Sequence, residues 1–253
     1  MGEHKPVNIL AIDTASALLS VALEAPSGRY VFEGDGAGSH AERLMVIIEW
    51  LLENAGLRRE ELELVSCMEG PGSFTGLRIG FAAAKGLALA LGIPLLPVPT
   101  LDCLALPHAA WPGPVVAAMD AKKKRFFAAI YRRGEKCTAD LDAAPEEIAA
   151  LLAPFCENGD PVFLAGPDTP LLHAALLPFT LTAPIAPDPA YRRGASGALL
   201  DISRKRGIVL RENCFASDGA GPVYVRKSDA ELQSGLKNGN DEEQRVSGNC
   251  GSA

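Results

Sequence analysis

The sequence predicts an α/β fold with two related lobes, because one pattern of elements occurs twice. An apolar run ends in an aspartate at residues 7–13 and again at residues 114–120. After each aspartate the chain turns into a second apolar strand, and a hairpin leads to a third. Continuous apolar runs are typical of central strands buried on both faces. We therefore expect two lobes around a cleft, each with a central mixed sheet and helices.

Proline-rich and polar stretches set the expected boundaries. The N-terminal lobe is predicted at residues 1–106 and a smaller second lobe at residues 107–189, with the boundary in a proline-rich stretch. Part of residues 190–227 is expected to complete the N-terminal lobe. Residues 228–253 are polar and glycine-rich without an apolar period, which predicts a disordered tail.

Composition narrows the function classes. The chain has 253 residues, 48% of them hydrophobic, which is enough for a substantial core. Its net charge of −7 disfavours a stand-alone nucleic-acid binder, which usually carries a basic face. Six widely spaced cysteines without a C-x-x-C pair predict neither a zinc site nor a disulfide framework. No uninterrupted apolar run has the length of a membrane span, so we expect a cytoplasmic protein without membrane contact.

The most distinctive stretch is a glycine-rich turn at residues 69–80, between an apolar strand and a predicted helix. A strand, a glycine turn and a helix can cradle an anion. The Walker A motif, however, requires a lysine after its last glycine, and here Gly76 is followed by a leucine and an arginine. A structural turn is therefore favoured. Ser73 and Thr75 are the candidates for a helix cap, or for a phosphate contact.

Asp13 and Thr14 are the other candidates for contacting a ligand. Asp13 stands at the carboxyl end of a predicted strand, where sites in α/β sheets lie. The alternative is that Asp13 caps its turn through the local backbone. Both interpretations remain open at this point.

Several motifs together resemble the bacterial TsaB (YeaZ) family. The glycine turn carries the longest of them, and the resemblance extends over most of the chain. The motifs are residues 9–14, His40 with Glu42, residues 70–80, residues 84–88 and residues 222–226. The resemblance implies an actin-like or sugar-kinase-like (ASKHA) duplicated fold, in agreement with the repeated strand pattern.

The resemblance also implies a function. TsaB-like proteins are non-catalytic subunits that pair with TsaD, which transfers threonylcarbamoyl to adenosine 37 of tRNA, and with the ATPase TsaE. No catalytic residue, cofactor or metal is then expected on this chain, and ATP would bind on TsaE or TsaD or at the complex interface. tRNA would be contacted only through the complex. TsaD holds a metal with a histidine pair four residues apart, whereas here His40 is followed by Leu44.

Two alternatives are a small-molecule kinase with an actin-like fold and a protein resembling M22-type peptidases. The kinase would need a second glycine-rich loop for adenosine, and residues 166–168 and 194–197 are only weak candidates. The peptidase would need a nucleophile elbow or a zinc spacing, and neither pattern occurs. ATP binding by the isolated chain would favour the kinase.

The expected partner surface lies on two helices, residues 40–54 and 75–91. In the first helix, Val46 and Trp50 lie opposite the apolar core face. The second helix is apolar nearly all round, which predicts that other elements or a partner pack against both of its sides. Its larger residues, opposite a row of small ones, are expected to face a partner. The predicted interface comprises Val46, Trp50, Leu77, Arg78, Phe81, Ala84, Lys85 and Ala88. The resemblance implies that TsaD and a second copy of the chain use this same surface.

A basic turn, Lys122 to Arg125, follows the second aspartate. It is interpreted as a solvated turn or as a contact to RNA or phosphate.

Overall fold

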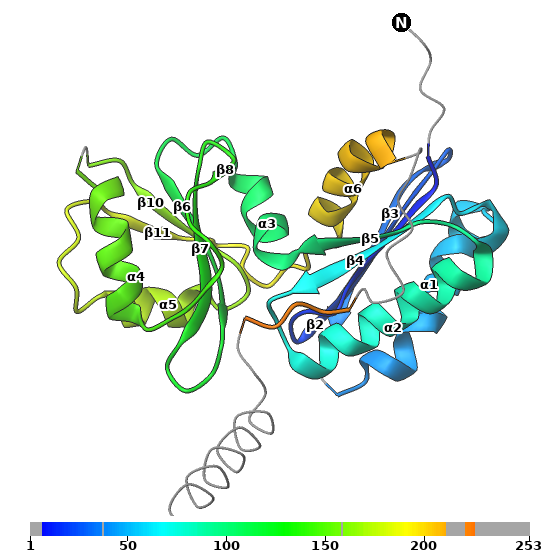
Figure 1. Ribbon diagram of the computed structural model, residues 1–253, viewed down its shortest axis with the longest axis horizontal. Helices are drawn as coiled ribbons and strands as arrows, with labels where there is room; N and C mark the ends of the chain where they lie inside the picture. Colours follow the sequence, from blue (N-terminus) through cyan, green and yellow to red (C-terminus); the bar gives the residue numbers. More distant parts are fainter. Residues whose placement is uncertain (1–6, 37, 158, 211–220, 226–253) are drawn as a thin grey trace, which may run out of the picture.

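The computed structural model describes residues 7–36, 38–157, 159–210 and 221–225 (Figure 1). The predicted disordered tail at 228–253 lies outside the described residues. Two mixed sheets stand side by side with helices between them and on their outer faces.

The first sheet has the strand order β3-β2-β1-β4-β5. Its first three strands run antiparallel, and β4 and β5 continue parallel to β1. The strands are β1 (Ile9–Asp13), β2 (Leu18–Ala25), β3 (Gly28–Asp35), β4 (Leu64–Gly70) and β5 (Leu95–Pro99). All five residues of β1 are buried, as a central strand requires.

The second sheet repeats this topology. Its order is β11-β10-β6-β7-β8, so β6 takes the place of β1 and β10 that of β4. Strand directions also match, since β6, β7 and β8 are antiparallel and β10 and β11 run parallel to β6. The strands are β6 (Pro114–Asp120), β7 (Phe126–Arg132), β8 (Glu135–Lys136), β10 (Val162–Ala165) and β11 (Ile185–Pro187), with β9 (Leu141–Ala143) paired to β7. The predicted duplication is confirmed, and the fold is the actin-like α/β fold.

Each half contributes three helices in equivalent places. The first two of each half cover the outer face of their own sheet, and the third packs between the two sheets. The helices are α1 (His40–Ala55), α2 (Phe74–Leu91), α3 (Thr100–Ala105), α4 (Pro145–Leu152), α5 (Thr169–Leu176) and α6 (Ser196–Leu210). Short 3-10 turns occupy Arg59–Glu61, Leu106–His108 and Ala153–Phe155.

The third helices are exchanged between the halves. α3 comes from the first half and packs against β6, whereas α6 comes from the second half and packs against β1 and β2. Side chains alternate along the strands accordingly: Leu10 and Ile12 point toward α1 and α2, while Ile9 and Ala11 join the core shared by the two sheets. The exchange ties the two lobes together through one continuous apolar core.

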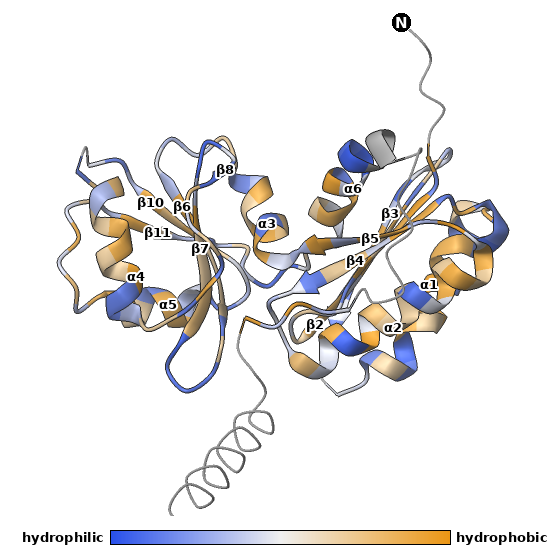
Figure 2. Cartoon of the chain, viewed as in Figure 1, coloured by the Kyte–Doolittle hydropathy of each residue, from blue (hydrophilic) through white to orange (hydrophobic). Residues whose placement is uncertain are grey.

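Helix α2 is 18 residues long and apolar enough, by length and composition, to cross a membrane. The apolar sequence of the helix is interrupted by Arg78 and Lys85, in line with the expectation that no uninterrupted apolar run reaches this length. In the fold α2 packs as a core helix against the first sheet, and its buried residues face β4 and β1. Figure 2 shows apolar residues on the strands of both sheets as well as on α1 and α2.

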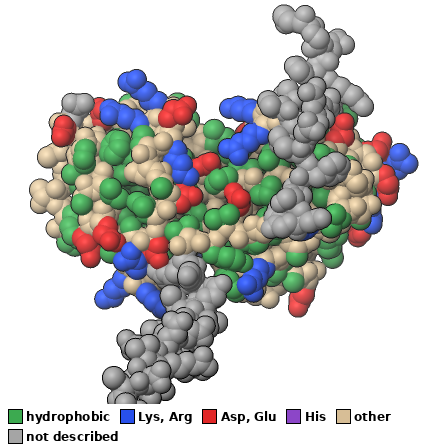
Figure 3. Space-filling view, viewed as in Figure 1, with side chains coloured by type: hydrophobic (Ala, Val, Ile, Leu, Met, Phe, Trp, Pro, Cys, Tyr) green, Lys and Arg blue, Asp and Glu red, His purple; other side chains and the backbone are tan. Residues whose placement is uncertain are grey.

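Charged side chains of both signs are dispersed over the face shown in Figure 3. No single-sign basic field appears on the described part of this face, unlike the footprint of a stand-alone nucleic-acid binder.

Candidate functional site

Helix α1 presents an apolar surface to solvent. Its core side, including Leu44, Ile48 and Leu51, is buried against the first sheet. On the opposite side Val46 and Trp50 are 65% and 51% exposed, and Met45, at the margin of the core side, is 40% exposed. The prediction that Val46 and Trp50 lie outside the core is confirmed. A large exposed aromatic beside an exposed valine is the usual composition of a protein-binding surface.

The prediction for α2 was wrong in part. Leu77, Phe81, Ala84 and Ala88 are only 1%, 4%, 0% and 5% exposed and belong to the core. They therefore cannot form the exposed patch predicted for them. Arg78 is exposed and Lys85 is half-buried. The exposed row of α2 carries Phe74, Arg78, Ala82, Gly86 and Leu89 instead.

Close approach of β1 to α2 explains this orientation. A Cβ on Gly76 would collide with the carbonyl oxygen of Thr14, and one on Gly80 with the Thr14 hydroxyl. The Thr14 hydroxyl also donates a hydrogen bond to the carbonyl of Gly76 at 2.8 Å. The glycines therefore face the sheet, and the larger residues flanking them are drawn into the core with them.

Asp13 is held by backbone groups from two distant parts of the chain. One carboxylate oxygen accepts from the N–H of Ala15 at 3.0 Å, and the other from the N–H of Ala195 at 2.8 Å. Its side chain is buried, and burial raises the pKa of Asp13 above its ordinary value of 3.8, although the two N–H groups and His40 lower it. These contacts are those of a turn cap that also joins β1 to the start of α6. Both Asp13 and Thr14 thus bond within the fold.

The raised pKa of Asp13 predicts a pH dependence. Between pH 3.8 and the raised value, the folded chain binds more protons at this group than the unfolded chain does. The contribution of Asp13 to stability is therefore full below pH 3.8 and declines as the pH rises through the folded-state pKa. The wild-type protein should lose free energy of unfolding relative to Asp13→Asn over that interval, as urea titrations at a series of pH values can measure. A gain relative to the variant would show that the hydrogen bonds outweigh burial.

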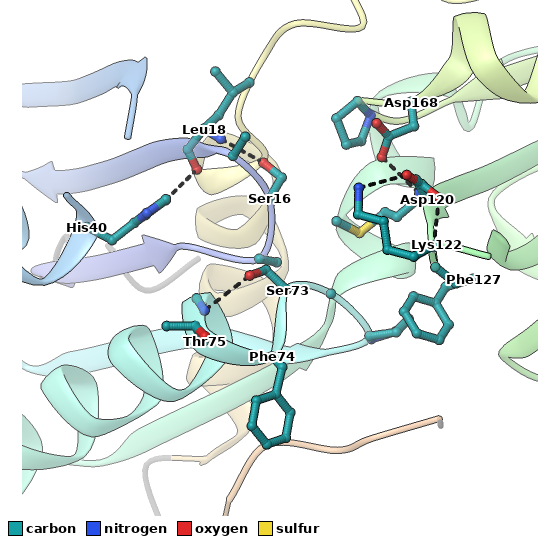
Figure 4. Close-up of a pocket in the computed structure, with 18 of the residues that line it drawn as sticks. Ser16, Leu18, His40, Ser73, Phe74, Thr75, Asp120, Lys122, Phe127 and Asp168 are labelled. Atoms are coloured by element: carbon teal, nitrogen blue, oxygen red, sulfur yellow. Dashed lines mark hydrogen bonds and ion pairs between the residues drawn. The ribbon is translucent and has the colours of Figure 1, made fainter. Parts of the chain in front are cut away.

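A cleft of about 950 Å³ opens between the lobes (Figure 4). Its volume is within the range of small-molecule sites. Ser73 and Thr75 lie on one wall at the start of α2, and the Ser73 hydroxyl caps the helix by accepting from the N–H of Gly76 at 3.3 Å. His40 lies near them, with Nε2 3.4 Å from the carbonyl of Leu18.

The opposite wall of the cleft carries Asp120, Lys122 and Asp168. Lys122 lies 2.8 Å from Asp120, and the N–H of Asp120 donates to Asp168 at 2.9 Å. Sequence reasoning identified Asp168 only as part of a weak candidate for a glycine loop. A Gly-Pro pair stands at the carboxyl end of β4 and of β10, and Gly70 and Gly166 have φ of 120° and 122°. That repeated dipeptide could have indicated that the two turns are equivalent.

At least two of the four basic residues in the turn at 122–125 form ion pairs with neighbouring acidic residues. Lys122 is paired with Asp120, and Arg125 is paired with Asp142 at 2.8 Å and Glu147 at 3.1 Å. These pairs favour a structural turn over an RNA contact. Across the described ranges, no group of three or more histidine, cysteine or acidic residues has the arrangement of a metal site.

Comparisons with known proteins give one consistent family. A family model described as TsaD, tRNA N6-adenosine threonylcarbamoyltransferase, matches residues 35–159. The tRNA threonylcarbamoyladenosine biosynthesis protein TsaB of Escherichia coli is 35% identical over 133 residues, which are 51% of this chain and 57% of that protein. The chain thus spans little more than half the length of this curated relative.

Two longer matches cover nearly whole proteins. An uncharacterized protein of Mycobacterium tuberculosis is 30% identical over 227 residues, 88% of this chain and 93% of that protein. The structure of YeaZ from Pseudomonas aeruginosa is similar with a TM-score of 0.68 and 28% identity, covering 86% of this chain and 99% of that one. Since the sequence and the fold agree over these lengths, the chain belongs to the TsaB (YeaZ) family.

Proposed function

We propose that this protein is a non-catalytic subunit of the cytoplasmic machinery that forms N6-threonylcarbamoyladenosine at adenosine 37 of tRNA. In this role it binds TsaD and, together with TsaE, activates it. The relative in E. coli carries the name of this pathway. The observation that carries the proposal for this chain is the exposed apolar pair on α1, formed by Val46 and Trp50.

The partner is argued from likeness between the two chains. The TsaD family model matches residues 35–159, which include α1 and α2. Related subunits of one fold can pair through equivalent faces, as identical subunits do in a two-fold dimer. The helix pair α1 and α2 would then meet the corresponding pair of TsaD. A second copy of this chain could use the same surface, so homodimer and heterodimer would exclude each other.

The polar groups of the cleft support a subunit that leaves the nucleotide to its partners. The Ser73 hydroxyl caps α2 and Lys122 is paired with Asp120, while Asp13 and Thr14 bond to backbone atoms and lie outside the cleft lining. We therefore expect isothermal titration of the isolated protein with ATP to give weak binding or none. Micromolar binding that Lys122→Ala abolishes would contradict this and favour the kinase alternative.

Co-purification tests the proposed partnership. Tagged protein, produced together with TsaD and TsaE of the same organism, should retain TsaD through size-exclusion chromatography. Tagged protein carrying Leu171→Glu is the control and should retain TsaD equally well, because Leu171 is 55% exposed on α5, in the other lobe. Recovery of TsaD with neither protein would exclude the partnership.

A further inference from the structure

Residues 221–225 return to the N-terminal lobe and lie beside the end of β4 (Figure 1). The N–H of Val223 donates to the carbonyl of Glu69 at 2.8 Å. The Val223 carbonyl lies so close to Gly70 that a Cβ there would collide with it. Position 70 therefore requires glycine for two reasons: a side chain would collide with Val223, and the backbone has a φ of 120°. This contact fixes the segment against the first turn of α2.

The segment holds one side chain of α2 in place. The guanidinium of Arg78 lies 3.8 Å from the centre of the Phe74 ring, and Arg78 Nε donates to the Tyr224 hydroxyl at 3.1 Å. The Phe74 and Tyr224 rings are 5.0 Å apart, centre to centre. Phe74 and Tyr224 are 40% and 37% exposed. Together the three residues form an aromatic–arginine platform at the N-terminal end of α2.

The platform has unused binding capacity. Only the Nε of Arg78 donates a hydrogen bond within the described residues. No carboxylate of these residues lies within 4.0 Å of the guanidinium. A guanidinium held over an aromatic ring can present its remaining donors in the fork that matches a carboxylate. Because the stacking already restricts the side chain, less conformational entropy is lost on binding.

The location favours a protein partner. Phe74 and Tyr224 line the cleft, but Arg78 does not, so its fork is not directed at a cleft ligand. Arg78 lies on the exposed row of α2 that includes Leu89, and α2 packs beside α1 with its exposed Trp50.

We infer that Phe74, Arg78 and Tyr224 bind an acidic side chain of TsaD and extend the docking surface of α1. This inference rests on the proposed function. Residues 221–225 are then a third element of the interface, after α1 and α2. The Tyr224 hydroxyl positions the guanidinium of Arg78, and that guanidinium is the group that pairs with the acidic side chain.

Affinity for TsaD, measured by titration at low and high salt, tests the inference. Arg78→Lys keeps the charge but loses the fork, and it should weaken binding about tenfold. Arg78→Met should weaken it further and flatten its salt dependence, since the ion pair is removed. Tyr224→Phe removes only the hydroxyl and should weaken binding less than Arg78→Lys. Arg204→Lys on α6 is the matched control and should bind as the wild type does.

Melting temperatures of all variants must match the wild type, so that a loss of binding is not a loss of folding. If Trp50→Glu weakens binding while the Arg78 and Tyr224 variants bind normally, the inference is overturned and the proposed function stands. If the wild-type protein does not bind TsaD at all, the proposed function falls with it. Arg78 variants that bind TsaD normally but reduce tRNA retention by the complex would assign the platform to RNA phosphate instead.

Discussion

Trp50→Glu is expected to weaken binding to TsaD by about thirtyfold or more, because a buried aromatic anchor typically contributes ~2 kcal/mol or more to an interface. In the free chain Trp50 is 51% exposed and belongs to no buried core cluster of the described residues, so its replacement disturbs the fold little. Glutamate would in addition place a charge within an apolar contact. The melting temperature of the isolated protein should be nearly unchanged.

Titration calorimetry with TsaD measures this effect. Leu171→Glu, on an exposed apolar residue of the other lobe, is the control and should bind normally. Phe81→Glu is unsuitable as an interface probe, since Phe81 is 4% exposed and its substitution would place a charge in the core. A Trp50→Glu protein that folds and binds TsaD with wild-type affinity would remove α1 from the interface.

Gly76→Ala is expected to destabilise the protein by about 2–4 kcal/mol, whereas Gly86→Ala in the same helix should stabilise it by about 0.5–1 kcal/mol. A Cβ at Gly76 would collide with the backbone carbonyl of Thr14, which a side-chain movement cannot relieve. A Cβ at Gly86 meets nothing within 4 Å. Both variants replace glycine by alanine in the same helix. The difference between their free energies of unfolding therefore measures the effect of the close contact with Thr14 at the end of β1.

Urea unfolding of the two variants gives the comparison directly. Equal effects at Gly76 and Gly86 would mean that α2 does not approach β1 as closely as described. A Gly86→Ala protein that is more stable but binds TsaD less well would show that Gly86 serves the partner contact rather than the fold.

The duplicated fold was predictable because its signal is local. The apolar runs ending at Asp13 and Asp120 are buried central strands in both lobes, and a two-sided burial leaves a continuous apolar sequence. Helix α1 was also predictable, since its polar and apolar faces are distinct. Val46 and Trp50 could be placed outside the core from periodicity alone.

Helix α2 was not predictable in the same way. Helix α2 is apolar nearly all round. Its hydrophobic periodicity therefore indicates that other elements pack on both sides, but it does not show which row of residues faces the sheet. The contact of Gly76 and Gly80 with Thr14 decides that question, and it joins segments that are about sixty residues apart in sequence. Sequence reasoning took Leu77 and Phe81 as the outer row because larger apolar residues suit an interface.

Two further features depend on contacts across most of the chain. Asp13 could be a ligand contact or a turn cap until its bond to Ala195 was seen. Residues 222–226 stood out as a motif, but the bond between Arg78 and Tyr224 spans 146 positions. No local pattern specifies such pairs, because they arise only when distant parts of the chain pack together in the fold.

Reconstituted modification of tRNA is the most direct measurement of the central claim. TsaD and TsaE of the same organism, supplied with tRNA and the threonylcarbamoyl donor, should form N6-threonylcarbamoyladenosine only when this protein is added, and formation should be largely lost with Trp50→Glu. Modification that proceeds equally well without the protein would contradict the proposed role. Full activity with a correctly folded Trp50→Glu protein would contradict the proposed surface.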